Sequence, residues 1–531
     1  MKIGLIVDNL HIARWQADAL ARLPPECEIL VYNCTNSRPS RRSLEHALYY
    51  GLNLACLRTR TTAQVRLPEA LKVAGRMDFA AEYEGAWQRL PQPLLDKIAA
   101  DQPALLLKFG MGLLRVPAAS ELAIPILSYH HGDSRAFRGR PAGFHELLTG
   151  RDTIGQVVQI LSNSLDAGEI VAFAETKAHG HSYRRTMVES YRCSPLLLKT
   201  AIANALSGKR IAIEATGKIY RLPSNTLVLR FLVEQLRCLL RHVTYGAMFE
   251  KYWEVAEAPV PADAGAAPLS RLPDRTTWRV ARCPPEYRFL ADPFYHPEGL
   301  GLLVEALRKS TNSGEILFLS PTAETPLTNG TGGHYSYPAT CTVDGQHFMV
   351  PEMSEWSAAR LYRLSQSRLE DVGELDVPGR PRLIDPTLFL SDAGVFLFAN
   401  DDRDGSSVLR LWHADSLFDR FAEHGSSPIR ISPAGSRMAG AIHVAANGAR
   451  FRFGQDLRRD YGDGIVIFRV DAISPAEYRE TEVGAVRLAG LRGPHTLNFR
   501  DGDVVFDYYS DRFSPLAGVR RLRSRARRSL S

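Results

Sequence analysis

Two side chains that could handle a proton together, His130 and Asp166, each follow an apolar run in a polar turn. His130 comes after IPILSY and opens the run HHGD, and Asp166 lies in SLDAGEIV after IGQVVQIL. An imidazole can accept a proton, and in its charged form it can face a developing oxyanion. A neighbouring carboxylate fixes the ring tautomer and stabilises the imidazolium. The pair therefore predicts acid–base chemistry at one site, with the Ser128 hydroxyl as a further hydrogen-bond donor on a short side chain.

This part of the chain resembles the folate-dependent formyltransferases that act on methionyl-tRNA and amino sugars. The resemblance covers residues 1–210, is strongest over 100–172, and is carried by His130, Arg138, Gly139, Pro141, the run 154–160, Asp166 and Gly168. It implies transfer of a formyl group from 10-formyltetrahydrofolate to an amine, with His130 as acid–base group and Asp166 orienting it. The asparagine of the family motif is Ser128 here, so the oxyanion needs another donor, for which His131 or a backbone N–H of the HHGD turn could serve.

The run PALLLKFGMGLLRVP resembles the strand and loop that contact the folate in that family, which implies Lys108, Gly110 and Gly112 as folate-binding residues. The polar residues beside the catalytic pair, His131 and Asp133, and Arg138 in the following loop, are expected to bind the acceptor. Ordinary turn roles for these residues remain the alternative.

Alternating strands and helices must position these residues. The runs KIGLIV, CEILVY, ALLLKFG, IPILSYHH and IGQVVQIL are expected strands, and residues 12–23 and 91–100 are expected helices. Such alternation predicts a Rossmann-type, mostly parallel α/β sheet over residues 1–215. Ligands of such sheets bind at the carboxyl ends of the strands, which is where the HHGD run falls.

The rest of the chain has a different organisation. Residues 216–275 read as a helical connector, ending in the Pro/Ala-rich linker 257–274. From 276 to 512, helices give way to short strands with Gly, Asp and Asn turns, and a diffuse repeat of strand, turn and strand returns at the length of one four-stranded blade. We expect a five-bladed all-β propeller, with a β-sandwich as the alternative.

The repeated segment resembles the N-terminal domain of plant glucosamine inositolphosphorylceramide transferases and, more remotely, five-bladed glycosidases. The shared pieces include ADPF, SYP, VPE, DPTLF, RMAG and GPHTLN. Because the repeats open the innermost strands, Tyr337 and the expected acceptor-binding residues Asp292, Asp385, Arg437 and His495 should converge at one channel mouth. The domain could bind a glycan, or it could cleave one with Glu352 or Glu305 as the acid.

Composition narrows the choice of function. The formal net charge of +7 comes mostly from the final run VRRLRSRARRSLS, so no nucleic-acid face is expected. Residues 513–531 should form a disordered basic tail, which could contact an acidic surface weakly. The seven cysteines are scattered, which favours neither disulfides nor a metal site, and indicates a reducing cytoplasm. No run is long and apolar enough for a transmembrane helix.

Two hypotheses follow. The first is an N-formyltransferase using 10-formyltetrahydrofolate and an amine of a sugar-like or sugar-conjugated small molecule, held by the propeller. The second is a glycan-binding or glycan-processing propeller that carries a degenerate formyltransferase domain.

Overall fold

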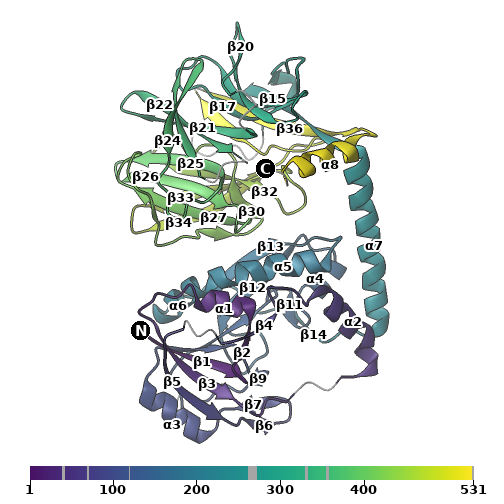
Figure 1. Cartoon of the computed structure of the whole chain (residues 1–531), viewed down its shortest axis with the longest axis vertical. Helices are drawn as coiled ribbons and strands as arrows, with labels where there is room; N and C mark the ends of the chain where they lie inside the picture. Colours follow the sequence, from purple (N-terminus) through teal and green to yellow (C-terminus); the bar gives the residue numbers. More distant parts are fainter. Residues whose placement is uncertain are drawn as a thin grey trace. The chain divides into compact units, whose positions relative to one another are not determined.

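The structure of the chain is a computed structural model that describes all residues except 39–41, 68–70, 119, 261–271, 329–332, 354–357, 501 and 529–531. It contains two compact units, Met1–Leu240 and Arg241–Ser531 (Figure 1). Most of the linker predicted at 257–274 therefore lies outside the described residues.

The first unit is built on a sheet in which β5, β3, β1, β8 and β10 run parallel in that order, and β12 and β13 continue it antiparallel. Nearly every residue of β1 is buried, as expected for a parallel strand covered on both faces. The strands of this sheet are β1 Lys2–Asp8, β3 Glu28–Cys34, β5 Val73–Phe79, β8 Leu105–Lys108, β10 Ile126–His130, β12 Thr153–Ile160 and β13 Glu169–Lys177. All five expected strands are confirmed, and so is the α/β class of this unit.

Shorter elements complete the first unit. The additional strands are β2 His11–Ala13, β4 Gln64–Arg66, β6 Glu82–Glu84, β7 Trp87–Arg89, β9 Leu113–Leu114, β11 Phe137–Gly139 and β14 Lys218–Tyr220. The helices are α1 Arg14–Leu20, α2 Ala47–Cys56, α3 Gln92–Asp101, α4 Phe144–Leu148, α5 Tyr183–Cys193, α6 Leu197–Leu206 and α7 Asn225–Met248, the last of which continues into the second unit. Helices α1 and α3 confirm the two expected at 12–23 and 91–100.

Among its described residues, the second unit contains five antiparallel sheets of four or five strands each, several strands of which are labelled in Figure 1. The first sheet holds β17 Tyr287–Tyr295, β18 Leu302–Arg308, β19 Gly314–Leu319 and β20 Glu324–Pro326. The second holds β21 Tyr335–Val343, β22 Gln346–Met353, β23 Arg360–Ser365 and β24 Arg368–Glu374. The third holds β25 Leu383–Ser391, β26 Gly394–Asp401, β27 Val408–Ala414, β28 Ala422–Glu423 and β29 Arg430–Ile431. The fourth holds β30 Ala434–Met438, β31 His443–Val444, β32 Arg450–Asp456, β33 Ile465–Ile473 and β34 Tyr478–Val486.

The fifth sheet joins strands from the two ends of this unit. Its strands are β15 Phe249–Pro259, β16 Arg279–Val280, β35 Leu497–Arg500 and β36 Asp503–Phe513. Strand β15 pairs with β36 along its whole length, from Phe249 opposite Phe513 to Pro259 opposite Asp503. The prediction of a helical connector over 216–275 is therefore wrong for the β15 segment, which a sheet partner far along the chain stabilises as a strand.

The first strands of the sheets contact one another in succession. Strand β17 contacts β21, β21 contacts β25, β25 contacts β30, and β17 also contacts β35. Next to β30, the Ala441 N–H donates to Asn498 Oδ1 of β35 at 2.8 Å. Strands β17, β21 and β25 each contain a β-bulge, where the register with the neighbouring strand shifts. At each bulge the residue before a proline has a φ of 47–49°; these residues are Asp292, Tyr337 and Asp385. The three strands therefore bend in the same way at equivalent positions.

The basic C-terminal segment is not simply a tail. Residues 517–528 form helix α8 (Ala517–Arg528), and Arg520 makes an ion pair with Glu250 of β15. The prediction of disorder over 513–531 is therefore wrong for this helix, because contacts with β15 hold it. Residues 529–531 lie outside the described residues.

Candidate functional site

Strand β10 carries the predicted catalytic histidine to the carboxyl end of the first unit's sheet. Successive side chains of a strand point to opposite faces, so Ser128 and His130 share one face, while Tyr129 points to the other. Both Ser128 and His130 are buried. Two of the three predicted catalytic residues therefore lie on the same face of the sheet.

The third catalytic residue, Asp166, lies beside the histidine. His130 Nδ1 is 3.5 Å from Asp166 Oδ1, and His130 Nε2 is 3.2 Å from the Phe137 carbonyl oxygen. Asp166 has a φ of 46°, and its other carboxylate oxygen accepts a hydrogen bond from the Gly139 N–H at 2.8 Å. Because both ring nitrogens face oxygen acceptors, the site suits an imidazole that gains and releases a proton.

Lys108 reaches the same place from the neighbouring strand. It ends β8, and its register partner on β10 is Ser128. Burial lowers the pKa of Lys108 to about 8, although the charges of Asp8 and Asp166 act to raise it. The lysine was predicted to bind folate, but its position beside Ser128 and in the field of Asp166 also suits an oxyanion donor.

The predicted folate-binding turn follows β8. A Cβ on Gly110 would lie 2.5 Å from the Asp8 backbone N, so this glycine lets the turn approach the end of β1. Asp8 in turn accepts a hydrogen bond from the Met111 N–H at 2.9 Å. Sequence reasoning missed Asp8, although an acid that ends the apolar run KIGLIVD is a usable signal.

The turn also has room for a ligand group. The atom nearest to a Cβ on Gly112 would be Gln88 Oε1, at 3.8 Å. That oxygen is buried and, within the part of the chain that the structure describes, has no hydrogen-bond partner. A ring with N–H donors, such as a pterin, fits the chemistry of this acceptor.

Two predicted acceptor-binding residues, His131 and Arg138, make contacts within the first unit. His131 packs against Trp15, Tyr129 and Tyr191, with ring centroids 4.5–6.5 Å away, and burial together with His130 lowers its pKa to about 3. The His131 ring thus belongs to an aromatic cluster and also borders a small cavity that His130 lines, and its assignment to acceptor binding or as a replacement oxyanion donor stays a prediction. Arg138 donates to the Leu165 carbonyl at 2.5 and 3.0 Å, so it positions the turn that carries Asp166.

Asp133 borders a separate cavity of about 390 Å³ in the first unit. Its carboxylate accepts from the backbone and guanidinium of Arg135 at 2.8–3.0 Å. Glu146 lines the same cavity, and burial raises its pKa to about 7. An acceptor-binding role for Asp133 stays a prediction.

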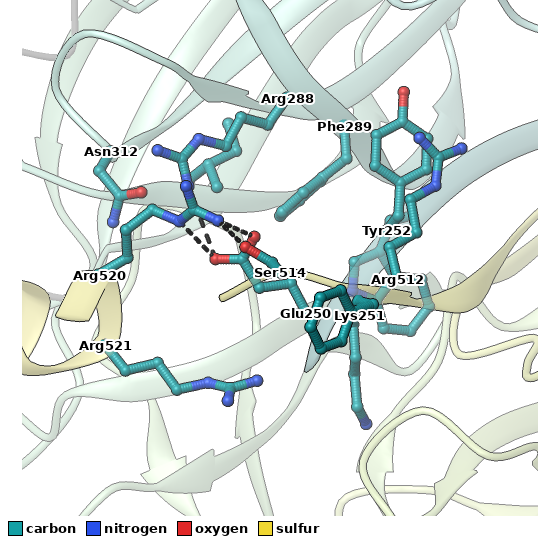
Figure 2. A pocket seen from close by; sticks show the side chains of 13 residues that line it. Glu250, Lys251, Tyr252, Arg288, Phe289, Asn312, Arg512, Ser514, Arg520 and Arg521 are labelled. Atoms are coloured by element: carbon teal, nitrogen blue, oxygen red, sulfur yellow. Dashed lines mark hydrogen bonds and ion pairs between the residues drawn. The ribbon is translucent and has the colours of Figure 1, made fainter. Parts of the chain in front are cut away.

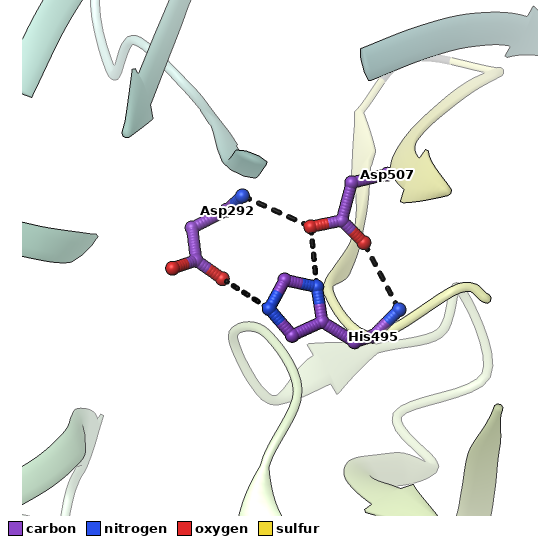
Figure 3. Close-up of side chains that lie close together, drawn as sticks. All are labelled: Asp292, His495 and Asp507. Carbon is purple, nitrogen blue, oxygen red and sulfur yellow. Dashed lines mark hydrogen bonds and ion pairs between the residues drawn. The ribbon is translucent and has the colours of Figure 1, made fainter. Parts of the chain in front are cut away.

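In the second unit, Asp292 and His495 meet with an acid that sequence reasoning missed, Asp507 (Figure 3). His495 Nδ1 is 2.5 Å from Asp507 Oδ2, and its Nε2 is 3.3 Å from Asp292 Oδ1. Asp507 also accepts from the Asp292 N–H at 2.9 Å. Burial acts to lower the pKa of His495, but the two carboxylates outweigh it and raise the pKa. One ligand atom from each of the three residues lies within 4.8 Å of the others, so the group could also hold a metal ion.

Asp385 and Arg437 form a second buried pair. Arg437 Nε is 2.5 Å from Asp385 Oδ2, and Arg437 Nη2 is 3.1 Å from Asp385 Oδ1 and 3.2 Å from Glu352 Oε2. Gln455 donates to Asp385 at 2.8 Å. The structure therefore brings the four predicted residues of this unit into two pairs, Asp292–His495 and Asp385–Arg437.

The two pairs share one electrostatic environment. Burial raises the pKa of Glu305 well above its usual range, and the negative charges of nearby acids, including Asp292 and Glu352, raise it further. Burial likewise raises the pKa of Asp292, where Asp385 and Asp507 add to the effect, and raises that of Asp385 to about 7. An acid that holds its proton near neutral pH is one of the groups that acid–base cleavage of a glycosidic bond requires.

Comparison with known proteins bears on the second unit. Residues 277–498 match the family described as glucosamine inositolphosphorylceramide transferase 1, N-terminal. The second unit resembles that domain. Glucosamine inositolphosphorylceramide transferase 1 of Oryza sativa subsp. japonica is 31% identical over 209 residues, which cover 37% of this chain and 28% of the relative. The protein of the same name from Arabidopsis thaliana is 27% identical over 225 residues, covering 40% and 29%. The matches thus span less than a third of these relatives.

Solved structures with similarity to this chain include formyltransferases. An N-formyltransferase from Helicobacter canadensis, in complex with folinic acid and dTDP-3-aminofucose, is 12% identical with a TM-score of 0.28, over 45% of this chain and 81% of that one. Glycinamide ribonucleotide transformylase 1 from Symbiobacterium toebii is 22% identical with a TM-score of 0.26, over 42% and 94%.

Among the helices of the described residues, none has the length and apolarity needed to cross a membrane.

Proposed function

We propose that the first unit transfers a formyl group from 10-formyltetrahydrofolate to an amine of a sugar-like or sugar-conjugated small molecule. The observation that carries this proposal is the His130–Asp166 pair, 3.5 Å apart at the carboxyl end of the sheet, with Lys108 and Ser128 on adjoining strands. A proton acceptor, its orienting carboxylate and two donors for an oxyanion are the groups that this transfer needs.

The roles follow from the positions of the side chains. His130 accepts the proton that the attacking amine loses, and Asp166 stabilises the imidazolium that results. The imidazolium then returns the proton to the nitrogen of tetrahydrofolate as the bond from that nitrogen to the formyl carbon breaks. The Lys108 ammonium donates to the oxygen on which negative charge develops, and the shorter Ser128 hydroxyl assists it. Arg138 holds the Leu165–Asp166 turn in place through the Leu165 carbonyl.

The donor's place is the turn after β8. Bound 10-formyltetrahydrofolate supplies the formyl group, and the Gly110–Gly112 backbone with Gln88 Oε1 would hold its ring system. The unpaired acceptor beside Gly112 supports this assignment.

The first test is calorimetry of the full chain with 5-formyltetrahydrofolate, a stable relative of the donor. We expect binding that Gln88→Ala weakens and that the exposed substitution Gln92→Ala on α3 leaves unchanged. No detectable binding at millimolar ligand would refute the transferase proposal and favour the second candidate.

The second candidate function belongs to the second unit alone. We propose that its five sheets form a five-bladed propeller, supported by the succession of contacts among β17, β21, β25, β30 and β35. In this candidate the propeller binds or cleaves a glycan, and the first unit is catalytically degenerate. The raised pKa values of Asp292, Glu305 and Asp385 favour it.

A glycan array and a panel of aryl glycosides separate the two activities of this candidate. Binding that Arg437→Met abolishes, without hydrolysis of any glycoside, would support a binding module that could also hold the acceptor of the first proposal. Hydrolysis that Glu305→Gln abolishes would support a glycan-processing enzyme.

A further inference from the structure

A cavity of about 590 Å³ lies in the second unit, lined by residues of β15, β36, β17 and α8 (Figure 2). Four arginines line it: Arg288, Arg512, Arg520 and Arg521. Glu250 is the one acidic residue among the described lining residues. We call this cavity the arginine pocket. Its volume lies within the usual range of about 300–1,000 Å³ for small-molecule sites.

The charges of the arginine pocket do not balance. Glu250 accepts from Arg520 at 2.6 and 2.7 Å and lies 4.0 Å from Arg288. Lys251 also lines the pocket, but its ammonium is 2.9 Å from Asp460. Four guanidinium groups against one carboxylate leave an excess of three positive charges. Like charges held together in a partly enclosed space repel one another, so a bound anion would stabilise the arrangement.

Contacts within the protein hold these cations in place. The guanidinium carbon of Arg512 lies 3.3 Å from the centre of the Tyr252 ring, and no described carboxylate forms an ion pair with it. Arg521 donates to the Phe249 carbonyl at 2.7 Å. Figure 2 shows Arg288 and Arg520 side by side next to Glu250. A site whose donors are already positioned loses little side-chain entropy when a ligand binds.

We propose that the arginine pocket binds a phosphate-bearing small molecule. Guanidinium groups match phosphate oxygens with paired, charge-assisted hydrogen bonds. An excess of three positive charges suits a phosphate monoester or a diphosphate better than a single carboxylate. The rings of Tyr252 and Phe289 line the pocket and offer apolar surface to the carbon skeleton of the ligand. The phosphate could belong to a soluble compound or to a lipid headgroup.

The test uses the full chain and inorganic pyrophosphate as the probe, titrated by calorimetry at low and at physiological salt. We expect binding that weakens as salt rises, because exposed charge pairs are screened. Arg512→Gln should weaken it at least tenfold, and Arg288→Gln provides an independent variant from another strand. The matched control is Arg479→Gln, an exposed arginine of β34 whose removal should change nothing. No binding at millimolar pyrophosphate, or equal affinity of wild type and Arg512→Gln, would overturn the proposal.

Sedimentation with phosphatidylcholine vesicles, with and without phosphatidic acid, identifies the source of the phosphate. Binding to the acidic vesicles that Arg512→Gln removes would assign a lipid headgroup. Pyrophosphate binding without vesicle binding would assign a soluble ligand. Vesicle binding that is insensitive to Arg512→Gln, with no pyrophosphate binding, would refute the pocket and implicate only the general basicity of α8.

Discussion

Lys108 and Ser128 are register partners on the adjacent parallel strands β8 and β10. The serine is shorter than the asparagine of the motif that its position resembles. The neighbouring strand offers a longer cation at the same level of the sheet, so the proposed site has two donors from two strands. Four predictions follow from this site and from the buried acids of the second unit.

Replacing Lys108 tests whether its ammonium acts on the oxyanion. Burial lowers its pKa to about 8, so the group is charged below that pH and loses its charge as pH rises through it. Formyl transfer should therefore decline above about pH 8. Lys108→Met should lower the single-turnover rate by about 10²–10³-fold, typical for one oxyanion donor, and should remove that decline. A pH–rate profile checks both, with Lys97→Met on α3 as an exposed control.

The roles proposed for His130, Asp166 and Ser128 predict how strongly substitution of each residue lowers the rate of formyl transfer. His130→Ala and Asp166→Asn should each reduce formyl transfer by several powers of ten, as in triad enzymes. Asparagine tolerates the left-handed φ of 46° at position 166, so Asp166→Asn removes the charge with little strain. Ser128→Ala should cost only about tenfold to a hundredfold. Single-turnover rates rank the three, and a nearly silent His130→Ala would contradict the assigned chemistry.

The two glycines of the proposed folate turn should respond differently to alanine. At Gly110 a Cβ would meet the Asp8 backbone N at 2.5 Å, so Gly110→Ala should lower the free energy of unfolding by about 1–3 kcal/mol. At Gly112 the nearest atom would be 3.8 Å away, so Gly112→Ala should leave stability unchanged but weaken binding of 5-formyltetrahydrofolate. Urea denaturation and calorimetry measure the two effects. Unchanged folate affinity in Gly112→Ala would argue against the turn as the folate site.

The buried acids predict that the second unit loses stability as pH rises. The pKa of Asp385 is raised by burial to about 7 in the folded state, against about 3.9 in an unfolded chain. Between these values the folded state holds more protons, so the free energy of unfolding falls with rising pH. Asp292 and Glu305 shift in the same direction. The denaturation midpoint, followed by tryptophan fluorescence, should fall from pH 5 to pH 8.

Asp385→Asn should flatten that dependence, because the amide does not titrate. Asp392→Asn, an exposed aspartate in the turn between β25 and β26, provides the matched control. A steeper fall in Asp385→Asn than in the control would contradict the assigned direction.

The sequence predicted site residues best where a side chain with suitable chemistry lies in a polar turn directly after an apolar strand. His130 and Asp166 could be placed because each polar turn follows an apolar strand, and the structure puts them 3.5 Å apart. The position of His131 next to His130 in the sequence did not indicate that its ring packs in an aromatic cluster. Strand alternation sends the side chain of the preceding Tyr129 away from that of His130, and the His131 ring stacks on the same aromatic cluster as Tyr129.

Other features of the second unit could not be predicted from a short stretch of sequence, because they depend on contacts between residues far apart in the chain. Strand β15 follows a long helix, and its partner β36 lies far along the chain. Asp507 is the one buried acid of the three in β36, and only the fold brings it to 2.5 Å from His495. A lone buried acid in an apolar run is nevertheless a signal that sequence reading can use.

The pairing of β15 with β36 also constrains how this protein can be made. During synthesis β15 emerges early, but its partner appears only after the four intervening sheets have been translated. Until then β15 presents an open edge, which is a hazard for association with other chains. Such distant pairing slows folding, because the loop must close before the contact stabilises anything. A nascent chain arrested before residue 503 would therefore expose the edge of β15, which chaperones and proteases can recognise. The second unit can hide this edge only once the chain is finished, so completion of the chain is a step at which the cell can control its quality.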